Sequence, residues 1–273
     1  MSDFLASMRA SSLQRVRRAM ATTPLHQVVG TALALPRPPT MQPGIAGFDV
    51  IAEVKRSSPA YGELSSETPD ALVKRAQAYA KAGAIAVSVL TEPQRFGGNL
   101  AHLSEIAHAL RPLGVPAMRK DFIVDVYQVW EAAAAGAGGV LLIVRMIDDA
   151  MLMEMLEAAA QAKMFVLLEA FDKNDLLRAR PFVGVHKRIL VGLNARDLST
   201  LEVDFQRLIV LAREFPPNCL RVAESGISTV AEVKAVAQAG YALALVGTAL
   251  MRAAKPQALV AEMLEAGREA TQW

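Results

Sequence analysis

Two mostly apolar runs end in lysine, a pattern that points to the binding of an anion. The first run covers residues 50–54 and ends at Lys55, and the second covers residues 115–119 and ends at Lys120. Such runs are typical of buried strands. Because a buried ammonium group without a partner is costly, we expect both lysines to point into a cavity that accepts an anion. For either lysine alone, a side chain that reaches into solvent is the commoner arrangement.

Further along the chain, more apolar runs also end in a polar residue. These residues are Glu169, Asn194 and Glu224, the last followed by Ser225. A barrel of parallel strands brings the carboxyl ends of all its strands to one face, so distant residues of this kind can form one site. Glu53 shares an alternating face with Lys55 and is expected to point inward. Lysines and carboxylates together are suited to general acid–base catalysis, although Glu169 or Glu224 alone is as readily an ordinary surface residue.

Two glycine turns between an expected strand and an expected helix are candidates for phosphate binding. One comprises residues 225–229 and contains Gly226, and the other contains Gly247 and Thr248. Turns of this type leave backbone N–H groups free at a helix N-terminus, where an anion can bind. In many barrels the loops after strands seven and eight hold phosphate. It is also possible that each glycine only closes a tight turn.

The elements that must position these residues follow from the apolar pattern. We expect eight strands, near residues 49–54, 84–90, 115–119, 139–144, 164–169, 189–193, 220–224 and 243–247. Amphipathic helices are expected between strands at 69–82, 100–110, 126–135, 150–162 and 230–239. The spacing favours an α/β fold, an eight-stranded (β/α)8 TIM barrel. A proline-rich stretch, 35–43, separates an N-terminal helical extension, 1–48, from the barrel domain, 49–273.

Composition is consistent with a single-domain enzyme acting on a small molecule. The chain has 273 residues, 53% hydrophobic and 21% charged, and its net charge is only +2 with the basic residues scattered. We therefore expect no nucleic-acid partner. No apolar run approaches the roughly 20 residues of a membrane span, so we expect no membrane association and a cytoplasmic location. The single cysteine, Cys219, has no partner for a disulfide or a Cys-based metal site and is expected to be a structural thiol.

With these residues assembled, the chain resembles the indole-3-glycerol-phosphate synthase family of tryptophan biosynthesis. The resemblance covers roughly residues 49–255 and rests on the segments 51–59, 88–92, 96–98, 119–123, 125–128, 194–198, 224–227 and 246–252. It implies a ring closure in which 1-(2-carboxyphenylamino)-1-deoxyribulose 5-phosphate loses carbon dioxide and water to give indole-3-glycerol phosphate. The resemblance implies no cofactor and no metal. It implies one phosphorylated small-molecule substrate. The sequence leaves open whether the chain is a monomer or associates weakly with other enzymes of the pathway.

The resemblance also implies roles for individual residues. Lys120 matches the general acid, Glu169 the general base of dehydration, and Lys55 a second acid or a group that binds phosphate and carboxylate. Glu53 and Asn194 match residues that orient the lysines and the substrate, and Glu53 and Glu224 are expected to compensate the two positive charges. Further catalytic and substrate-binding matches are Ser225, Ser58, Pro59, Phe96, Phe122, Leu141, Leu198, Gly226, Gly247, Thr248, and Arg196 facing the substrate carboxylate.

The sequence departs from the usual family pattern at a few positions. Tyr61 stands where many members have lysine, Ala195 replaces an asparagine, Phe171 stands where histidine is frequent, and Thr248 replaces a serine. The chain could therefore be a paralogue in specialised indole metabolism. Two rival interpretations are a different barrel enzyme on a phosphorylated sugar, such as phosphoribosylanthranilate isomerase or a Schiff-base aldolase, and a barrel that binds an anion without turnover.

Overall fold

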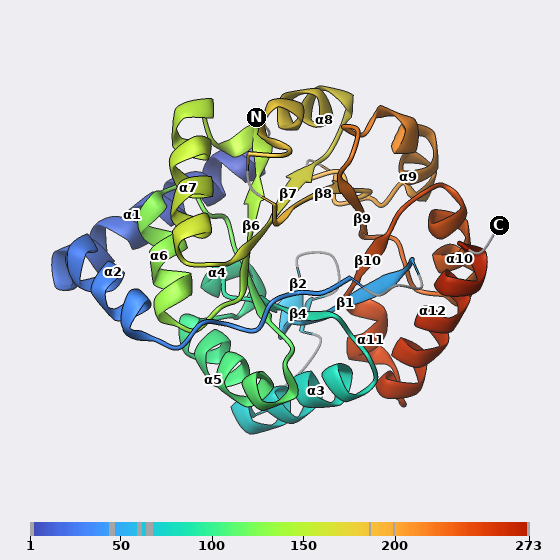
Figure 1. Ribbon diagram of the computed structural model, residues 1–273, viewed down its shortest axis with the longest axis horizontal. Helices are drawn as coiled ribbons and strands as arrows, with labels where there is room; N and C mark the ends of the chain where they lie inside the picture. Colours follow the sequence, from blue (N-terminus) through green and yellow to red (C-terminus); the bar gives the residue numbers. More distant parts are fainter. Residues whose placement is uncertain are drawn as a thin grey trace.

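Eight parallel strands form a closed barrel at the centre of the computed structural model (Figure 1). The structure describes residues 3–43, 47–58, 62–63, 68–185, 187–198 and 200–271. Around the barrel the strands follow the order β1-β10-β9-β8-β7-β6-β5-β4, so the first strand pairs with the last. The strands are β1 (Asp49–Val54), β4 (Ala86–Leu90), β5 (Ala117–Lys120), β6 (Gly139–Ile143), β7 (Phe165–Ala170), β8 (Ile189–Asn194), β9 (Leu220–Glu224) and β10 (Leu243–Val246). The expected eight-stranded (β/α)8 barrel is confirmed.

Helices cover the outer face of the barrel, which explains why its strands are apolar on both faces. Every residue of β1, β7 and β8 is buried. The expected helices are present as α3 (Pro69–Lys81), α5 (Leu100–Leu110), α6 (Val126–Ala134), α7 (Asp149–Gln161) and α10 (Val230–Gln238). A polar side chain caps the first turn of each of them, accepting a backbone hydrogen bond: Thr68, Asn99, Asp125, Asp148 and Thr229.

Several further elements were not among those expected from the sequence. The helices are α4 (Pro93–Phe96), α8 (Lys173–Ala179), α9 (Phe205–Leu211), α11 (Thr248–Arg252) and α12 (Pro256–Ala270), with short 3-10 turns η1 (Arg111–Leu113), η2 (Val144–Met146), η3 (Arg180–Phe182) and η4 (Ala212–Glu214). An antiparallel hairpin of β2 (Ser57–Ser58) and β3 (Gly62–Glu63) follows β1. Most of these pieces are too short to show a helical period. The exception is α12, whose buried residues include Val260, Met263 and Leu264 at helical spacing.

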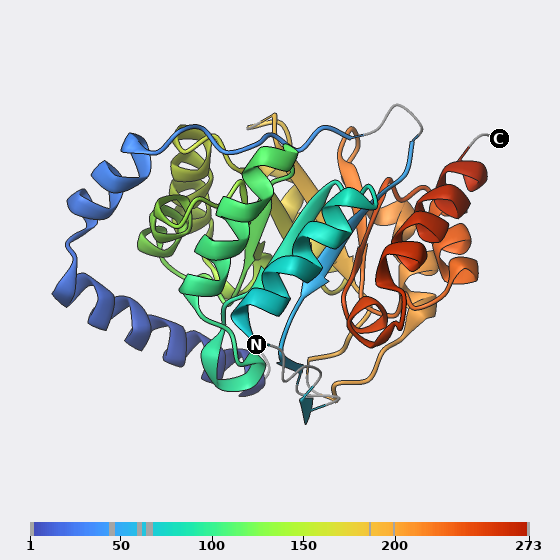
Figure 2. The same ribbon diagram turned by 90° about the horizontal axis from the view of Figure 1, so that it is seen from below.

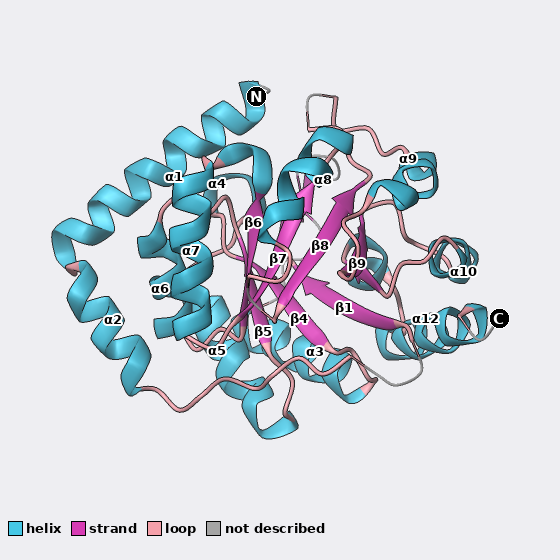
Figure 3. Cartoon of the chain, turned by 45° about the horizontal axis from the view of Figure 1, so that its top comes forward, coloured by secondary structure: helices cyan, strands magenta, loops and turns pink. Residues whose placement is uncertain are grey.

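Two helices precede the barrel and lie outside the ring, against α6 (Figure 3). They are α1 (Asp3–Thr22) and α2 (Leu25–Ala34). Three apolar residues of α1, Leu5, Met8 and Val16, are buried and join the barrel core. The division of the chain into an extension, 1–48, and a barrel domain, 49–273, stays a prediction.

The N-terminal segment reaches both ends of the barrel, as Figure 2 shows. At one end the start of α1 places Phe4 in the wall of the central cavity. Residues 35–43 run across the opposite end, where Met41 lines a small hollow with Phe165, the first residue of β7. The guanidinium group of Arg111 donates hydrogen bonds to backbone carbonyls of this segment, those of Pro36 and Arg37. Within the described part of the N-terminal stretch, α1 thus contributes to the mouth, whereas residues 40–43 lie at the opposite end.

Among the described residues, no helix has the length and apolar character needed to cross a membrane.

Candidate active site

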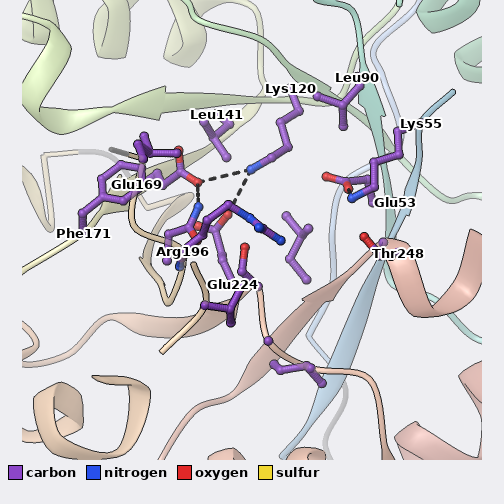
Figure 4. Close-up of a pocket in the computed structure, with 18 of the residues that line it drawn as sticks. Glu53, Lys55, Leu90, Lys120, Leu141, Glu169, Phe171, Arg196, Glu224 and Thr248 are labelled. Carbon is purple, nitrogen blue, oxygen red and sulfur yellow. Dashed lines mark hydrogen bonds and ion pairs between the residues drawn. The ribbon is translucent and has the colours of Figure 1, made fainter. Parts of the chain in front are cut away.

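A cavity of about 400 Å³ opens at the carboxyl ends of the barrel strands. Its lining brings together residues that are far apart in the sequence, and Figure 4 shows them pointing toward one another. Seven of the polar residues expected from the sequence line it: Glu53, Lys55, Lys120, Glu169, Asn194, Glu224 and Ser225. They lie on or directly after β1, β5, β7, β8 and β9, so the barrel geometry that gathers strand ends accounts for their convergence.

Lys120, at the end of β5, lies between two carboxylates. Its Nζ is 3.3 Å from Oε1 of Glu169 and 3.1 Å from Oε2 of Glu224 (Figure 4). The side-chain amide of Asn194 donates a hydrogen bond of 2.8 Å to the same Oε1 of Glu169 and fixes that carboxylate. Burial disfavours the ammonium form, but the charges of Glu169 and Glu224 outweigh this and raise the pKa of Lys120 above its ordinary value. Lys120 therefore keeps its proton at neutral pH.

Glu224 is the most unusual carboxyl group of the cavity. The residue is 1% exposed, and burial is the main reason that its pKa is raised to about 8, with Lys120 acting against the shift and Glu169 adding to it. Only Oε2 contacts Lys120, whereas Oε1 has no hydrogen-bond partner among the described residues. Glu224 can therefore hold a proton near neutral pH while it stays within hydrogen-bonding distance of Lys120.

Lys55 forms a separate pair with a carboxylate of its own chain segment, at the end of β1. Its Nζ lies 2.7 Å from Oε1 of Glu53, two residues earlier on the same chain segment. Figure 4 shows this pair to one side of Lys120, and a single strand, β4, separates β1 from β5. Glu53 thus faces one lysine and Glu224 the other, in the arrangement expected from charge compensation. Lys120 has a second carboxylate neighbour in Glu169, which was expected to act as a base and not as a compensating charge.

Aromatic and aliphatic side chains form one wall of the cavity. The rings of Phe4 and Phe122 meet edge to face with centroids 5.8 Å apart, and the ring of Phe96 lies 6.3 Å from that of Phe122. Leu141 and Leu198 also line the cavity, as expected from the sequence. The apolar residues of the lining that were missed are Phe4, Leu90, Ile143, Phe171, Leu201, Val203, Phe205, Ile227 and Leu245.

Phe171 is held in this wall by a charged group behind it. The guanidinium carbon of Arg145 lies 5.0 Å from the centre of the Phe171 ring. Arg145 also forms ion pairs with Asp172 and Asp175, and the second carboxylate accepts the backbone N–H of Phe171. The contact of Arg145 with the loop after β7 could not be found from spacing, because Arg145 follows β6.

Arg196 reaches the cavity from the loop after β8. Its backbone N–H donates to Oδ1 of Asn194 at 2.9 Å, and its Nη1 donates to the carbonyl oxygen of Leu201 at 2.7 Å. Leu201 adopts a left-handed backbone conformation with φ of 63°. The neighbouring Ala195, one of the departures from the family pattern, is completely buried. These contacts partly fix the guanidinium group of Arg196, which places a positive charge at the cavity.

The glycine turns lie at the same end of the barrel. Ser225, Gly226, Gly247 and Thr248 all line the cavity. One detail of the sequence expectation was wrong, because the backbone N–H groups at the start of α10 are not free. The carboxylate of Glu232 accepts hydrogen bonds from the backbone N–H groups of residues 228 and 229 as part of a capping box. These two N–H groups are therefore already bonded within the protein.

The loop after β1 contains two expected site residues, Ser58 and Pro59, and one departure from the family pattern, Tyr61. Ser58 belongs to strand β2, but its side chain lies outside the described part of the chain, and so do Pro59 and Tyr61.

The structure does place the thiol of Cys219 away from the cavity, because this residue comes directly before β9, at the end of the strand opposite Glu224. Burial raises the pKa of the Cys219 thiol, and Sγ donates to the carbonyl oxygen of Pro216.

Solved structures with similar folds are barrel proteins. The chain superposes on 3-hexulose-6-phosphate synthase from Salmonella typhimurium with a TM-score of 0.63 at 14% identity, covering 82% of this chain and 100% of the other. For orotidine 5'-phosphate decarboxylase from Pyrococcus horikoshii the TM-score is 0.59 at 12% identity, covering 82% of this chain and 99% of the other. At these identities the likeness concerns the fold alone.

Sequence comparison is more specific. The sequence profile of the indole-3-glycerol phosphate synthase family matches residues 32–263. The indole-3-glycerol phosphate synthase of Mycobacterium leprae is 40% identical over 265 residues, which cover 97% of this chain and 90% of the relative. That of Micrococcus luteus is 45% identical over 226 residues, covering 83% of this chain and 80% of the relative. The chain therefore belongs to the indole-3-glycerol phosphate synthase family, the carboxy-lyases of tryptophan biosynthesis.

Proposed function

We propose that this chain closes the indole ring of 1-(2-carboxyphenylamino)-1-deoxyribulose 5-phosphate, with Lys120 as the acid of the first step. The position of Lys120 between Glu169 and Glu224 is the observation that supports this most. Its raised pKa keeps the ammonium group charged at neutral pH. A charged donor at the substrate carbonyl stabilises the negative charge that develops on the oxygen as the ring closes.

The other walls of the cavity suggest how the substrate is oriented. We place the phosphate at the turns that contain Gly226 and Gly247, where backbone N–H groups and the Thr248 hydroxyl can bind it. The aromatic ring then lies against the apolar wall that includes Phe122, and its carboxylate faces Arg196. Arginine suits this position, because its planar guanidinium group can bind both oxygens of a carboxylate.

In the first chemical step, the ring carbon that bears the carboxylate attacks the keto carbon of the sugar chain. The carbonyl electron pair moves to oxygen, which takes a proton from Lys120. The carboxylate then leaves as carbon dioxide, and the electrons of its bond restore the aromatic ring. Glu224 lies 3.1 Å from Nζ and has its pKa raised to about 8, so it is suited to return a proton to Lys120.

In the second step, the new hydroxyl group leaves as water and a double bond completes the indole. Loss of water requires one acid for the hydroxyl and one base for the neighbouring C–H. We assign the acid to Lys55, which faces the cavity from the end of β1 beside Glu53, and the base to Glu169, which Asn194 holds in place. The alternative role of Lys55 is to bind the phosphate or the carboxylate of the substrate through its positive charge.

The rival assignment, a Schiff-base aldolase, requires a lysine that is neutral when it attacks a carbonyl carbon. The carboxylates around Lys120 favour its charged form and so argue against this chemistry. Borohydride trapping in the presence of substrate separates the two mechanisms, since an imine leaves a permanent mass increase on the lysine and the proposed acid catalysis leaves none.

The direct test is incubation of the protein with the substrate, with the rise of indole fluorescence followed in time and the product confirmed by mass. We expect turnover by the wild type and a loss of kcat of about 100-fold or more in Lys120→Met, with substrate binding still measurable. The matched control is Lys234→Met, because Lys234 also pairs with a glutamate, Glu269, at 3.1 Å but lies exposed on the surface. Turnover in Lys120→Met that equals that of the control would remove Lys120 from the mechanism.

A further inference from the structure

A glycine in the middle of β8 lies directly against the carboxylate of Glu224. Gly192 pairs with Glu169 on one side and with Val222 on the other. A Cβ atom added at Gly192 would lie 2.0 Å from Oε1 of Glu224 and 3.0 Å from its Cδ. These distances are far below van der Waals contact. The carboxylate therefore occupies the space that the side chain of any other residue at position 192 would need.

The backbone does not explain why position 192 is glycine. Gly192 is not among the glycines with positive φ, and it lies inside a regular parallel strand. β-Branched residues are the usual choice in such a strand, because glycine has no side chain to pack and is the more flexible in the unfolded chain. Position 192 therefore holds a residue of low strand propensity, and the close approach of the Glu224 carboxylate explains why.

The carboxylate that lies over Gly192 is the one that faces Lys120. Glu224 follows Val222 by two residues on β9, and its side chain leans back over the neighbouring strand to reach Gly192. In this position Oε2 lies 3.1 Å from Nζ of Lys120, while Oε1 lies over the glycine and has no hydrogen-bond partner within the described part of the chain. A methyl group at position 192 would push the carboxylate off the strand and change its distance to Lys120.

The second lysine of the cavity shows the same arrangement. A Cβ atom added at Gly247 would lie 2.2 Å from Oε1 of Glu53 and 2.9 Å from Nζ of Lys55. Each lysine–carboxylate pair thus lies against a glycine on an adjacent strand or at its end. Gly247 also borders the proposed phosphate position, so its substitution would mix two effects. Gly192 has no such second role in the proposed chemistry.

We propose that Gly192 is a positioning residue for the ring closure: the missing side chain lets the Glu224 carboxylate lie across β8 and so sets the geometry of its pair with Lys120. Gly192 touches no reacting atom and acts through Glu224. The inference rests on the proposed function, because it assumes that Lys120 and Glu224 take part in proton transfer.

The test is the variant Gly192→Ala, with Gly139→Ala as the matched control. Gly139 is also a strand glycine without room for a side chain, but its added Cβ would meet the ring of Phe165 and no charged group. We expect Gly192→Ala to lower kcat by about tenfold or more with a much smaller change in KM, since the affected contact serves the chemical step. Gly139→Ala is expected to lower thermal stability and to leave kcat of the folded protein near that of the wild type.

Two further measurements distinguish positioning from general damage to the barrel. The first is the pair of variants Glu224→Ala and Gly192→Ala/Glu224→Ala. Without the carboxylate, the nearest remaining neighbour of the methyl group is Cδ1 of Leu167 at 3.1 Å, the end of a side chain that has to shift by only a few tenths of an ångström. The second substitution is therefore expected to change kcat by less than about twofold, and the two effects are strongly non-additive. The double variant also covers the case in which Gly192→Ala alone does not fold. The second is the pH profile of kcat, which is expected to shift in Gly192→Ala and to stay unchanged in Gly139→Ala.

The outcomes for Gly192 and for the proposed function are separate. Lack of turnover by the wild type would contradict the proposed function, and the crystal structure of Gly192→Ala would then decide the inference by whether Glu224 has moved away from Lys120. With an active wild type, additive effects of the two substitutions would overturn the role of Gly192. Equal loss of kcat in Gly192→Ala and Gly139→Ala would overturn it as well.

Discussion

Removal of the Arg15 side chain is expected to loosen α1 from the barrel and to change the acid stability of the protein. Arg15 binds both oxygens of Asp121, with Nη1 2.8 Å from Oδ2 and Nη2 2.7 Å from Oδ1. Asp121 directly follows Lys120, and its side chain is completely buried. Ser12 strengthens this connection, because its hydroxyl group donates to the carbonyl oxygen of Phe122 and accepts from Gln128.

The size of the effect follows from what Arg15→Met leaves behind. Breaking a buried ion pair costs about 3–5 kcal/mol when the remaining charge has no other partner. Here Asp121 keeps the hydroxyl of Thr91 at 2.7 Å, the guanidinium of Arg119 at 3.2 Å and the backbone N–H of Phe122 at 2.8 Å. Arg15 is also partly exposed, which lowers the value of the pair further. We therefore expect a loss of about 2 kcal/mol, or a fall in Tm of roughly 4–8 °C.

The loss should depend on pH. Burial would raise the pKa of Asp121, but the hydrogen bonds and charges of Arg15 and Arg119 outweigh it and lower this pKa to about 2. A carboxyl group whose pKa is lower in the folded state stabilises the fold above its unfolded pKa, and this stabilisation disappears as the pH falls toward the folded pKa. The difference in free energy of unfolding between wild type and Arg15→Met is thus expected to have its maximum value at about pH 5 and above and to shrink between about pH 4 and pH 2.

Urea unfolding at pH 7 and at pH 3 measures both effects. The matched control is Arg17→Met, which removes the same side chain from the exposed face of the same helix. A loss of stability in Arg15→Met no larger than in Arg17→Met would refute the reasoning. So would a difference from the wild type that is the same at both pH values.

Three further predictions concern single side chains. Arg145→Met is expected to raise KM by about two- to tenfold with a smaller change in kcat, because the Phe171 ring loses its contact with a cation. An unchanged KM in steady-state kinetics would contradict this. Tyr241→Phe is expected to cost about 1 kcal/mol in urea unfolding, since the phenol donates a buried hydrogen bond of 2.7 Å to the carbonyl oxygen of Leu208, and no measurable loss would contradict this. Cys219→Ala is expected to keep kcat/KM within about twofold, and a tenfold loss would give the thiol a part in the reaction.

The barrel could be predicted from the sequence because each strand is marked locally. An apolar run that ends in one polar residue gives both the strand and the direction in which its last side chain points. For Lys120, Glu169 and Glu224 this was sufficient, since closure of the barrel brings all strand ends to one face. The short helices α8 and α9 lack such a signal, because seven residues show less than two helical turns.

The rest of the site depends on contacts that have no local pattern. Phe4 enters the cavity wall only because α1 packs beside the barrel, more than one hundred residues before its contact Phe122. Phe171 is fixed by Arg145 from another strand end. In the sequence, Gly192 is only a residue of low strand propensity within an apolar strand, and its contact with Glu224 becomes visible only in the folded structure. The second carboxylate beside Lys120, that of Glu169, likewise depends on side-chain directions that only the folded barrel defines.

The ion pair between Arg15 and Asp121 can form only after translation has passed both residues. The two residues are 106 positions apart. At a translation rate of about 5–20 residues per second, α1 waits roughly 5–20 s for its partner to be made. Until then the apolar face of α1, with Leu5 and Met8, has no barrel to cover it. A nascent chain arrested before residue 121 should therefore expose the apolar face of α1 to solvent.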